Sequence, residues 1–571
     1  MATPSLYKPQ VGFQIHPKIQ LNENELKIKN LLEDFCQYYN DLHPPVDGEL
    51  NNSHEPLMLR ITGGWVRDKL LGKESHDVDI AINKLSGESF ATQLQHFMSE
   101  NPQYSAMVDD PGNGSSKIHK IDKNPEKSKH LETVTTKLFD QSIDFVNLRD
   151  EEYADSNSRV PTTVQFGTAK QDALRRDATL NALFYNLTTE QIEDYTGQGE
   201  KDLELGVLRT PLEPLQTFLD DPLRILRLVR FAGQFGFKID DNAMDVLIHD
   251  EQNIKINLLR KVSKERIGIE FGKLLSAKYP VVGLKLLNKA DLYSIILNID
   301  PDFTDPHLDK FYYENFPTVF NNDIELLNGI YNDLKASSEL SPLEQELLAI
   351  LDPEQHDAKS DEEKNFQRNF YMIFIFKNLV TKSIFPTPTY EIKMVPPGNA
   401  KAGKKPKGFH PIEYMIKECF HFHKHDAELV DKVIVTNQEN LKLYFDESVF
   451  VKKSLLGFNL IRTMRTDDYW KLSLIMNYLE TYGDHAKREH FCKIFSYISA
   501  SGLGKVYEDK AVIDGKQLGQ ILNKKPGKWL REVNDLIFQW QLDHHGMNPE
   551  ELKEGCIKYI KEDEKIQNLI N

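Results

Sequence analysis

The chain has 571 residues and a hydrophobic content of 40%, so we expect several domains, each with its own core. Its formal net charge of −17 excludes a protein that coats nucleic acid indiscriminately, because such binding depends on excess positive charge. A membrane span is also excluded, because the sequence has no apolar run of about 18 residues.

The first predicted element is a helix within residues 20–45, whose apolar residues recur with helical spacing. Residues 57–62 predict a strand, which ends at Gly63 and Gly64 before a predicted helix over 65–71. Glycines at a strand-to-helix turn let the backbone approach a ligand, and the helix start offers free N–H groups to an anion. We therefore expect a phosphate group beside Gly63 and Gly64.

The next predicted strand, residues 78–82, carries a pair of acidic residues. Asp77 and Asp79 are two positions apart, so their side chains project to the same face. Paired carboxylates suit Mg²⁺, which takes oxygen ligands and bridges to substrate phosphates. A polar strand face without function is the alternative for this pair alone. Together with the glycine turn, however, it resembles the GG-x-VRD and D-x-D signature of the polymerase-beta-like nucleotidyltransferases.

A third carboxylate lies on a later strand. A helix is predicted over 86–100, a loop or hairpin over 101–135, and a strand over 142–148. Asp144 alternates with apolar neighbours, so it can reach the face of the first two aspartates. Three carboxylates around two metal ions recur in enzymes of nucleotidyl transfer. The alternative for Asp144 is a solvated strand residue.

Two arginines and an aspartate follow. Residues 149–172 are polar and predict a loop, after which Arg175, Arg176 and Asp177 precede an expected apolar helix in ALRRDATLNALFYNL. Arginine binds phosphate groups with a bidentate geometry that lysine lacks, and the aspartate can accept from ribose hydroxyls. A charged helix start is the alternative. The glycine-rich residues 194–211 then predict a hinge before a helical remainder.

A second distinctive helix is predicted to begin at Asp221 and Pro222. Arg224, Arg227 and Arg230 recur along one side of it. Cytosine and adenine both present an amino donor beside a ring-nitrogen acceptor, whereas uracil and guanine present a carbonyl oxygen and an N–H. Asp221 with Arg224 would therefore accept C and A and reject U and G. Helix capping is the alternative role for Asp221.

The ordered motifs GGWVRD…DVD, RRDATLNALF, DYTGQGEKDL, DDPLR and SKERIGIEF resemble the class II CCA-adding enzymes of the eukaryotic type over residues 20–285. The resemblance implies an α+β fold. An N-terminal mixed-sheet nucleotidyltransferase head would span 1–205, a helical base-reading neck 206–285, and a helical, tRNA-binding body and tail 286–571.

The resemblance also implies the roles of individual residues. The catalytic carboxylates would be Asp77 and Asp79, which hold the metal ions, joined by Asp144. The nucleotide-binding residues would be Gly63, Gly64 and Arg67 at the triphosphate, Arg176 and Asp177 at the phosphates and ribose, and Asp221 and Arg224 at the base, with Arg227 beside them. The family's glutamate before the reading aspartate is replaced by Asp220, a conservative departure. The loop that switches from C to A addition could be 101–135 or 149–161.

The function implied is template-independent addition of C, C and A to the 3′ end of tRNA from CTP and ATP, with Mg²⁺ and release of pyrophosphate. No obligatory protein partner is evident, and the family resemblance implies cytoplasm, nucleus and mitochondrion. A poly(A) polymerase, which shares the head motifs, and a non-catalytic RNA-binding scaffold are the alternatives. A base reader for both C and A argues against the first, and the intact carboxylates argue against the second.

Overall fold

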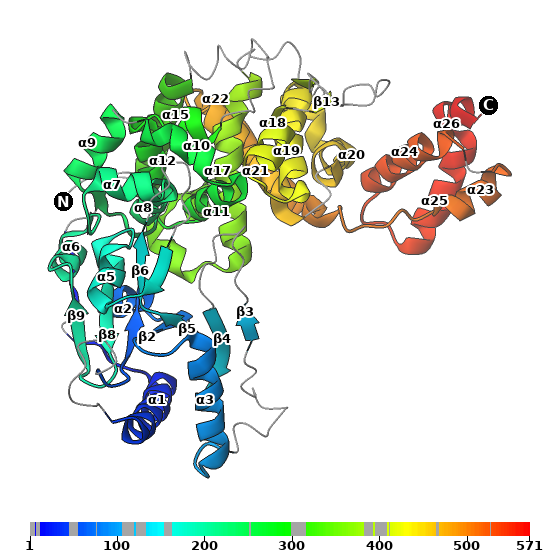
Figure 1. Cartoon of the computed structure of the whole chain (residues 1–571). Helices are drawn as coiled ribbons and strands as arrows, with labels where there is room; N and C mark the ends of the chain where they lie inside the picture. The colour runs from blue at the N-terminus through cyan, green and yellow to red at the C-terminus, as the bar shows by residue number, and fades with distance from the viewer. Residues whose placement is uncertain are drawn as a thin grey trace, which may run out of the picture. The chain divides into compact units, whose positions relative to one another are not determined.

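A computed structural model of the chain forms two compact units, Tyr7–Ile296 (the N-terminal unit) and Leu297–Asn571 with Met1–Leu6 (the C-terminal unit) (Figure 1). The structure describes residues 6, 12–16, 18–44, 55–75, 77–105, 119–121, 133–152, 163–250, 253–297, 316–381, 392–393, 408–409, 411–463, 467–525 and 527–570. Both candidate switch loops lie largely outside these residues.

A mixed seven-stranded sheet forms the centre of the N-terminal unit, with strand order β3-β4-β5-β2-β1-β8-β9. Its only parallel neighbours among the described strands are β2 and β5. The strands are β1 (Leu59–Thr62), β2 (Asp77–Ile82), β3 (His119–Ile121), β4 (Thr133–Leu138), β5 (Gln141–Asn147), β8 (Leu183–Asn186) and β9 (Gln191–Asp194). The predicted strands at 57–62, 78–82 and 142–148 are thus confirmed.

Helices cover both faces of the sheet and continue beyond it in the same unit. They are α1 (Glu23–Leu42), α2 (Gly64–Leu70), α3 (Gly87–Glu100), α5 (Ala169–Leu174), α6 (Gly199–Leu205), α7 (Pro214–Asp220), α8 (Leu223–Phe235), α9 (Asp241–His249), α10 (Ile254–Lys261), α11 (Lys264–Leu275), α12 (Pro280–Lys289) and α13 (Tyr293–Ile296). The predicted helices at 20–45, 65–71 and 86–100 correspond to α1, α2 and α3.

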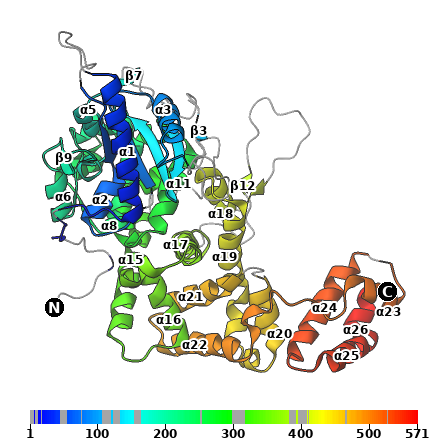
Figure 2. The same cartoon turned by 90° about the horizontal axis from the view of Figure 1, so that it is seen from below.

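The two faces of the sheet are packed differently. The helices α1 and α3 lie on one face (Figure 2). There, Phe35 of α1 meets Phe90 of α3 edge-on at 5.1 Å between ring centroids, and the ring centroid of Phe90 lies 4.8 Å from that of Phe145 of β5. On the other face, small side chains of α5, including the fully buried Ala173, pack in one cluster with Ala81 of β2. Because strand residues alternate between faces, the aspartates of β2 and β5 lie on the α5 side.

Two predictions on this part of the chain are wrong. The apolar run after Arg176 forms the strand β8 instead of a helix, preceded by a short 3₁₀ turn, Thr179–Asn181. All four residues of β8 are buried between β1 and β9, so no polar alternation distinguishes the strand from a buried helix. The expected loop at 149–172 contains the antiparallel pair β6 (Arg149–Glu152) and β7 (Thr163–Phe166), and then α5.

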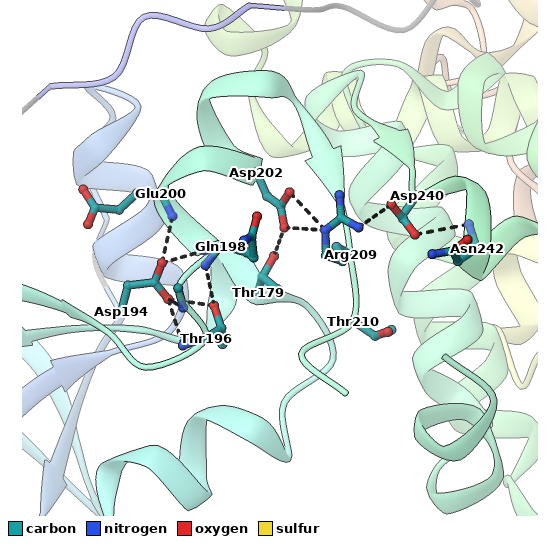
Figure 3. A network of polar contacts seen from close by, with 12 residues as sticks. Thr179, Asp194, Thr196, Gln198, Glu200, Asp202, Arg209, Thr210, Asp240 and Asn242 are labelled. Carbon is teal, nitrogen blue, oxygen red and sulfur yellow. Dashed lines mark hydrogen bonds and ion pairs between the residues drawn. The ribbon is translucent and has the colours of Figure 1, made fainter. Parts of the chain in front are cut away.

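The segment 194–211, predicted to be a hinge, is instead folded within the N-terminal unit and held by a polar network (Figure 3). Asp194 accepts hydrogen bonds from several backbone N–H groups, including that of Gly199 at 2.7 Å. The buried Asp202 of α6 accepts from Arg209 at 3.1 Å, and Arg209 also pairs with an aspartate at the start of α9. A short parallel pair, β10 (Val207–Leu208) with β11 (Lys238–Ile239), completes the segment.

The C-terminal unit is almost entirely helical where it is described. Its principal helices are α15 (Phe316–Ala336), α16 (Pro342–Leu351), α17 (Asp361–Thr381), α18 (Pro411–Tyr414), α19 (Lys424–Tyr444), α20 (Lys453–Leu456), α21 (Trp470–Glu480), α22 (His485–Ala500), α23 (Gly515–Leu522), α24 (Trp529–Asp543), α25 (Pro549–Glu562) and α26 (Glu564–Ile570). A two-residue pair, β12 (Ile392–Lys393) and β13 (Gly408–Phe409), is its sheet component. The α+β class is therefore confirmed. Over the described ranges, no helix has the length and apolar character needed to cross a membrane.

Candidate nucleotidyl-transfer site

The parallel pairing of β2 and β5 brings the predicted carboxylates together. In its register Asp79 lies opposite Asp144, and Asp77 lies one alternating position earlier on the same face. Asp77 is exposed, whereas Asp79 and Asp144 are half-buried. Thr135 of β4 donates a hydrogen bond to Asp144 at 2.6 Å and so fixes that carboxylate. Strand pairing thus brings together carboxylates that lie far apart in the sequence.

The electrostatics of this face favour a cation. Burial raises the pKa of Asp79 to about 6, and the neighbouring charges of Asp144 and Asp77 act in the same direction, while Arg176 opposes them. A bound cation would favour the ionised form of Asp79, and the oxygen donors of the cluster are of the kind that divalent cations prefer. In the described part of the chain, no three His, Cys, Asp or Glu side chains are already arranged around one metal position.

The glycine turn lies against the same carboxylate. Gly63 ends β1 with φ +77° and ψ −136°, a conformation that other residues rarely adopt. A Cβ atom at Gly63 would lie 3.2 Å from Nη1 of Arg176 and 3.9 Å from Oδ2 of Asp79. At Gly64 it would lie 3.1 Å from Nη2 of Arg67. The turn, two arginines and the buried carboxylate therefore converge at the end of β1.

The two arginines of the RRD segment (residues 175–177) are oriented by a residue that was not predicted from the sequence. Asp172 of α5, with 1% of its surface exposed, accepts from Nη2 of Arg176 at 2.7 Å and from Nε of Arg175 at 2.9 Å. Burial alone would raise the pKa of Asp172, but the two guanidinium groups lower it to about 2. Arg176 also donates to the backbone oxygen of Asn181 at 3.1 Å.

Asp177 is buried, and its carboxylate accepts two hydrogen bonds. Its Oδ1 accepts from the amide of Asn181 at 3.0 Å, and its Oδ2 accepts from Nε of Arg227 at 2.6 Å. Burial alone would raise the pKa of Asp177, but Arg227 and Asn181 hold it well below its usual value. Arg227 of α8 also lies 3.6 Å from Glu270 of α11, which pairs with Arg230. Glu270 therefore supports both of these arginines.

Arg67 does not extend freely toward solvent. Its Nη1 donates to Oδ1 of Asn181 at 2.6 Å, its Nε donates to Asp68 at 2.8 Å, and its guanidinium lies 4.6 Å from the ring centroid of Phe235. Arg67 is 6% exposed, and these contacts connect α2 with the turn that contains Asn181 and with α8. A triphosphate at Gly63 would meet this guanidinium already held in one orientation.

The predicted base-reading pair, Asp221 and Arg224, lies beside the RRD segment. Nη2 of Arg224 donates to the backbone oxygen of Arg175 at 2.6 Å, and its Nη1 donates to that of Thr217 at 3.4 Å. Asp221 ends α7, and its side chain accepts from the backbone N–H of Leu223 at 3.1 Å. The N-cap position of α8 is Pro222, without a side-chain cap, so the prediction that Asp221 is the N-cap is wrong. The bond from Leu223 nevertheless fixes the Asp221 carboxylate one turn before Arg224.

Sequence reasoning missed the residues that orient the others, chiefly Asp172 and Asn181. Each is a polar residue beside or within an apolar run, which is the only local signal of a buried hydrogen-bonding role. The partners of Asp172 are only three and four residues away, but Arg67, a partner of Asn181, is 114 residues away and could not be assigned before the fold was known.

Comparisons with known proteins agree with this geometry. The model of the poly A polymerase head domain matches residues 59–209, and that of the probable RNA and SrmB-binding site of polymerase A matches residues 236–305. The CCA tRNA nucleotidyltransferase, mitochondrial, of Candida glabrata is 39% identical over 96% of this chain and 97% of its own length. Its counterpart in Saccharomyces cerevisiae is 40% identical over 95% of this chain and 94% of its own length.

Solved structures with a similar fold include two bacterial proteins. The Thermotoga maritima CCA-adding enzyme complexed with tRNA has a TM-score of 0.52 and 18% identity, covering 95% of this chain and 96% of that one. The Bacillus stearothermophilus CCA-adding enzyme in complex with CTP has a TM-score of 0.53 and 14% identity, covering 95% of this chain and 100% of that one. At these identities the likeness establishes the fold.

Proposed function

The chain belongs to the family of CCA tRNA nucleotidyltransferases, and we propose that it adds C, C and A to the 3′ end of tRNA from CTP and ATP, without a template and with release of pyrophosphate. The observation that carries the proposal is the convergence of Asp79, Asp144, Gly63 and Arg176 at the end of β1. This arrangement places carboxylates for a metal beside a turn and a guanidinium for a triphosphate.

The carboxylates have the chemistry to hold divalent cations, and we propose Mg²⁺ on Asp77 and Asp79, with Asp144 adjoining. The position of Asp79 supports this, because a bound cation would offset the burial that chiefly raises its pKa and the smaller effects of the charges of Asp144 and Asp77. Bound Mg²⁺ would lower the pKa of the tRNA 3′-hydroxyl and stabilise the charge on the departing pyrophosphate.

The chain's own residues would bind and orient the nucleotide. Gly63 allows the triphosphate to approach the backbone, and Arg176, fixed by Asp172, would neutralise it. Asp177, which Asn181 and Arg227 keep ionised, would accept from a ribose hydroxyl. Each oxygen of a carboxylate can accept more than one hydrogen bond, so the existing bonds of Asp177 leave room for the sugar.

Base selection would depend on Asp221 and Arg224. The bond from Arg224 to the backbone of Arg175 supports this role, because it places the guanidinium next to the segment proposed to bind the phosphates and ribose. C and A would satisfy both side chains, whereas U and G would leave buried groups unpaired.

The proposed macromolecular substrate is tRNA, held by the helical C-terminal unit. The bacterial enzyme of the same fold complexed with tRNA supports this assignment. The names of the two yeast relatives support mitochondrial localisation, and cytoplasmic and nuclear pools are part of the proposal. The division into a head (1–205), neck (206–285) and body with tail (286–571) remains a prediction, and head and neck fall within one compact unit.

The function is tested by offering each nucleoside triphosphate separately to tRNAs that lack one, two or three 3′ nucleotides. We expect CTP to extend the two shorter tRNAs, ATP to extend only the tRNA that lacks one nucleotide, and UTP and GTP to be rejected. Long tails from ATP alone, with CTP ignored, would establish the poly(A) polymerase alternative instead.

A pair of variants tests the site itself. Asp77→Asn combined with Asp79→Asn should abolish incorporation, because the proposed metal ligands are lost. Asp245→Asn, which changes an exposed aspartate on α9, should leave incorporation unchanged. Full activity in the double variant would mean that the chemistry lies elsewhere in the chain.

A further inference from the structure

We propose that Asn181 is a positioning residue that holds Asp177 in the orientation needed to distinguish ribose from deoxyribose. The inference rests on the proposed function, in which Asp177 accepts from a sugar hydroxyl of the incoming nucleotide. It assigns to Asn181 a role in sugar selection that is separate from metal binding and from base reading.

The geometry of Asn181 permits only one orientation of its amide. Its Oδ1 accepts from Nη1 of Arg67 at 2.6 Å, and its Nδ2 donates to Oδ1 of Asp177 at 3.0 Å. A guanidinium can only donate and an ionised carboxylate can only accept, so exchanging the amide oxygen and nitrogen would break both bonds. Asn181 is 6% exposed, and water has little access to replace either partner.

The bond from Asn181 fixes the plane of the Asp177 carboxylate. Arg227 holds Oδ2 at 2.6 Å, and Asn181 holds Oδ1, so rotation about the last side-chain torsion would break one of the two bonds. Each oxygen keeps a lone pair in a defined direction for a further donor. Without Asn181, one contact of the two would remain, and the direction of that lone pair would no longer be fixed.

The effect of losing Asn181 should be greatest at the sugar. Arg67 would keep its bond to Asp68 and its contact with the Phe235 ring. Asp177 would keep only Arg227 among the contacts described above. A ribose hydroxyl is the group that would donate a hydrogen bond to the misaligned carboxylate. A 2′-deoxynucleotide lacks one of the two hydroxyls that could donate this bond.

Asn186 provides a matched control on the same segment. It is 2% exposed, and its Nδ2 donates to a carboxylate oxygen of Glu193 at 2.8 Å, so it resembles Asn181 in burial and in bonding. The side-chain partners of Asn186 are Glu193 of β9 and the backbone N–H groups of Thr188 and Thr189 in the turn between β8 and β9, and none is a proposed site residue. Replacement of either asparagine by aspartate is isosteric and turns an amide donor into a like-charged neighbour of a carboxylate.

The experiment measures kcat/KM of the full-length chain for CTP and 2′-dCTP on tRNA lacking CCA, and for ATP and 2′-dATP on tRNA lacking the final A. In Asn181→Asp and Asn181→Ala we expect kcat/KM for the ribonucleotides to fall at least about tenfold, and that for the deoxynucleotides to fall much less. The preference for ribose should thus shrink by about tenfold. Asn186→Asp should keep the wild-type preference.

The inference is overturned if Asn181→Asp keeps the wild-type preference for ribose, or if Asn186→Asp loses as much of that preference. It is also overturned if circular dichroism shows that both Asn181 variants are unfolded, since Asn181 would then serve the fold. Wild-type protein that adds C and A but uses 2′-dCTP as well as CTP would also overturn it, while leaving the proposed function intact. Wild-type protein that adds neither C nor A would overturn the proposed function itself.

Discussion

Replacing Asp172 by asparagine should remove a pH-dependent part of the stability of the N-terminal unit. Asp172 is 1% exposed and accepts hydrogen bonds from Arg175 and Arg176, which lower its pKa from 3.8 to about 2. The shift is just under two pKa units, and each unit corresponds to about 1.4 kcal/mol, so the ionised carboxylate contributes about 2 kcal/mol at neutral pH.

The sign of the pH dependence follows from the direction of the shift. The pKa in the folded chain is depressed, so this stabilisation is fully present above about pH 5 and is lost as the pH falls toward about 2. An asparagine side chain cannot titrate, so the gap in stability between wild-type protein and Asp172→Asn should narrow on acidification. By about pH 3, roughly half of this stabilisation should be gone.

Thermal unfolding of both proteins between about pH 7 and about pH 3 measures this gap. For a folded unit of this size, a change of about 1 kcal/mol moves Tm by about 2–4 °C, so the gap should narrow by a few degrees. A gap that stays constant over this range would refute the assignment of the low pKa to Asp172. In enzymatic assays the same variant should raise KM for CTP, because Arg176 loses the partner that orients it.

Asp202→Asn is a control for which the expected pH dependence of the stability difference has the opposite sign. Asp202 is equally buried, at 1% exposed, and accepts from Nε of Arg209 at 3.1 Å, but burial raises its pKa above 3.8. A raised pKa in the folded chain means that protonation favours the folded state, so wild-type protein should gain stability relative to Asp202→Asn as the pH falls. The same narrowing in both variants would point to general acid unfolding.

Three further predictions concern the site and the RNA. Gly63→Ala should lower activity at least about tenfold. An alanine in this positive-φ conformation would be strained by about 1–3 kcal/mol, and its Cβ would lie 3.2 Å from Nη1 of Arg176. Gly197→Ala, at φ +66° with no atom within 4 Å of the new Cβ, should remain active, and equal activity of the two variants would contradict the site geometry. Arg224→Ala should relax or abolish the choice of C and A in single-nucleotide incorporation assays, and retained selectivity would exclude it as the base reader. Lys528→Glu with Arg531→Glu, two exposed residues that line a surface hollow at the start of α24, should raise KM for tRNA several-fold and flatten its salt dependence. An unchanged KM for tRNA would place the RNA elsewhere.

The sequence predicted the central strands and the position of the carboxylates well, for physical reasons. The strands β1, β2 and β5 are short apolar runs beside glycines or charged residues, and the alternation of Asp77 and Asp79 with apolar residues has the two-residue period of a strand. The strand β8 was mistaken for a helix because it is buried on both faces, and a short apolar run carries no period. The pair β6 and β7 was missed because its residues are largely polar.

The partners of the site residues could not be predicted from the sequence. Arg67 and Asn181 are separated by 114 residues, and Asp177 and Arg227 by 50, so each bond exists only because the segment 177–181 meets α2 and α8 in the fold. Local patterns identify which side chains have the chemistry for a task. They do not identify the neighbour that fixes the orientation of each side chain.

These neighbours join the proposed phosphate, sugar and base contacts into one hydrogen-bonded structure. Arg224 donates to the backbone of the RRD segment, and Arg227 of the same helix holds Asp177. A nucleotide whose base displaced Arg224 would therefore disturb the segment proposed to bind its phosphates and sugar. Mispairing at the base should lower the rate of transfer as well as the affinity, because the proposed base reader Arg224 is bonded to the backbone of Arg175, next to the arginine proposed to bind the phosphates.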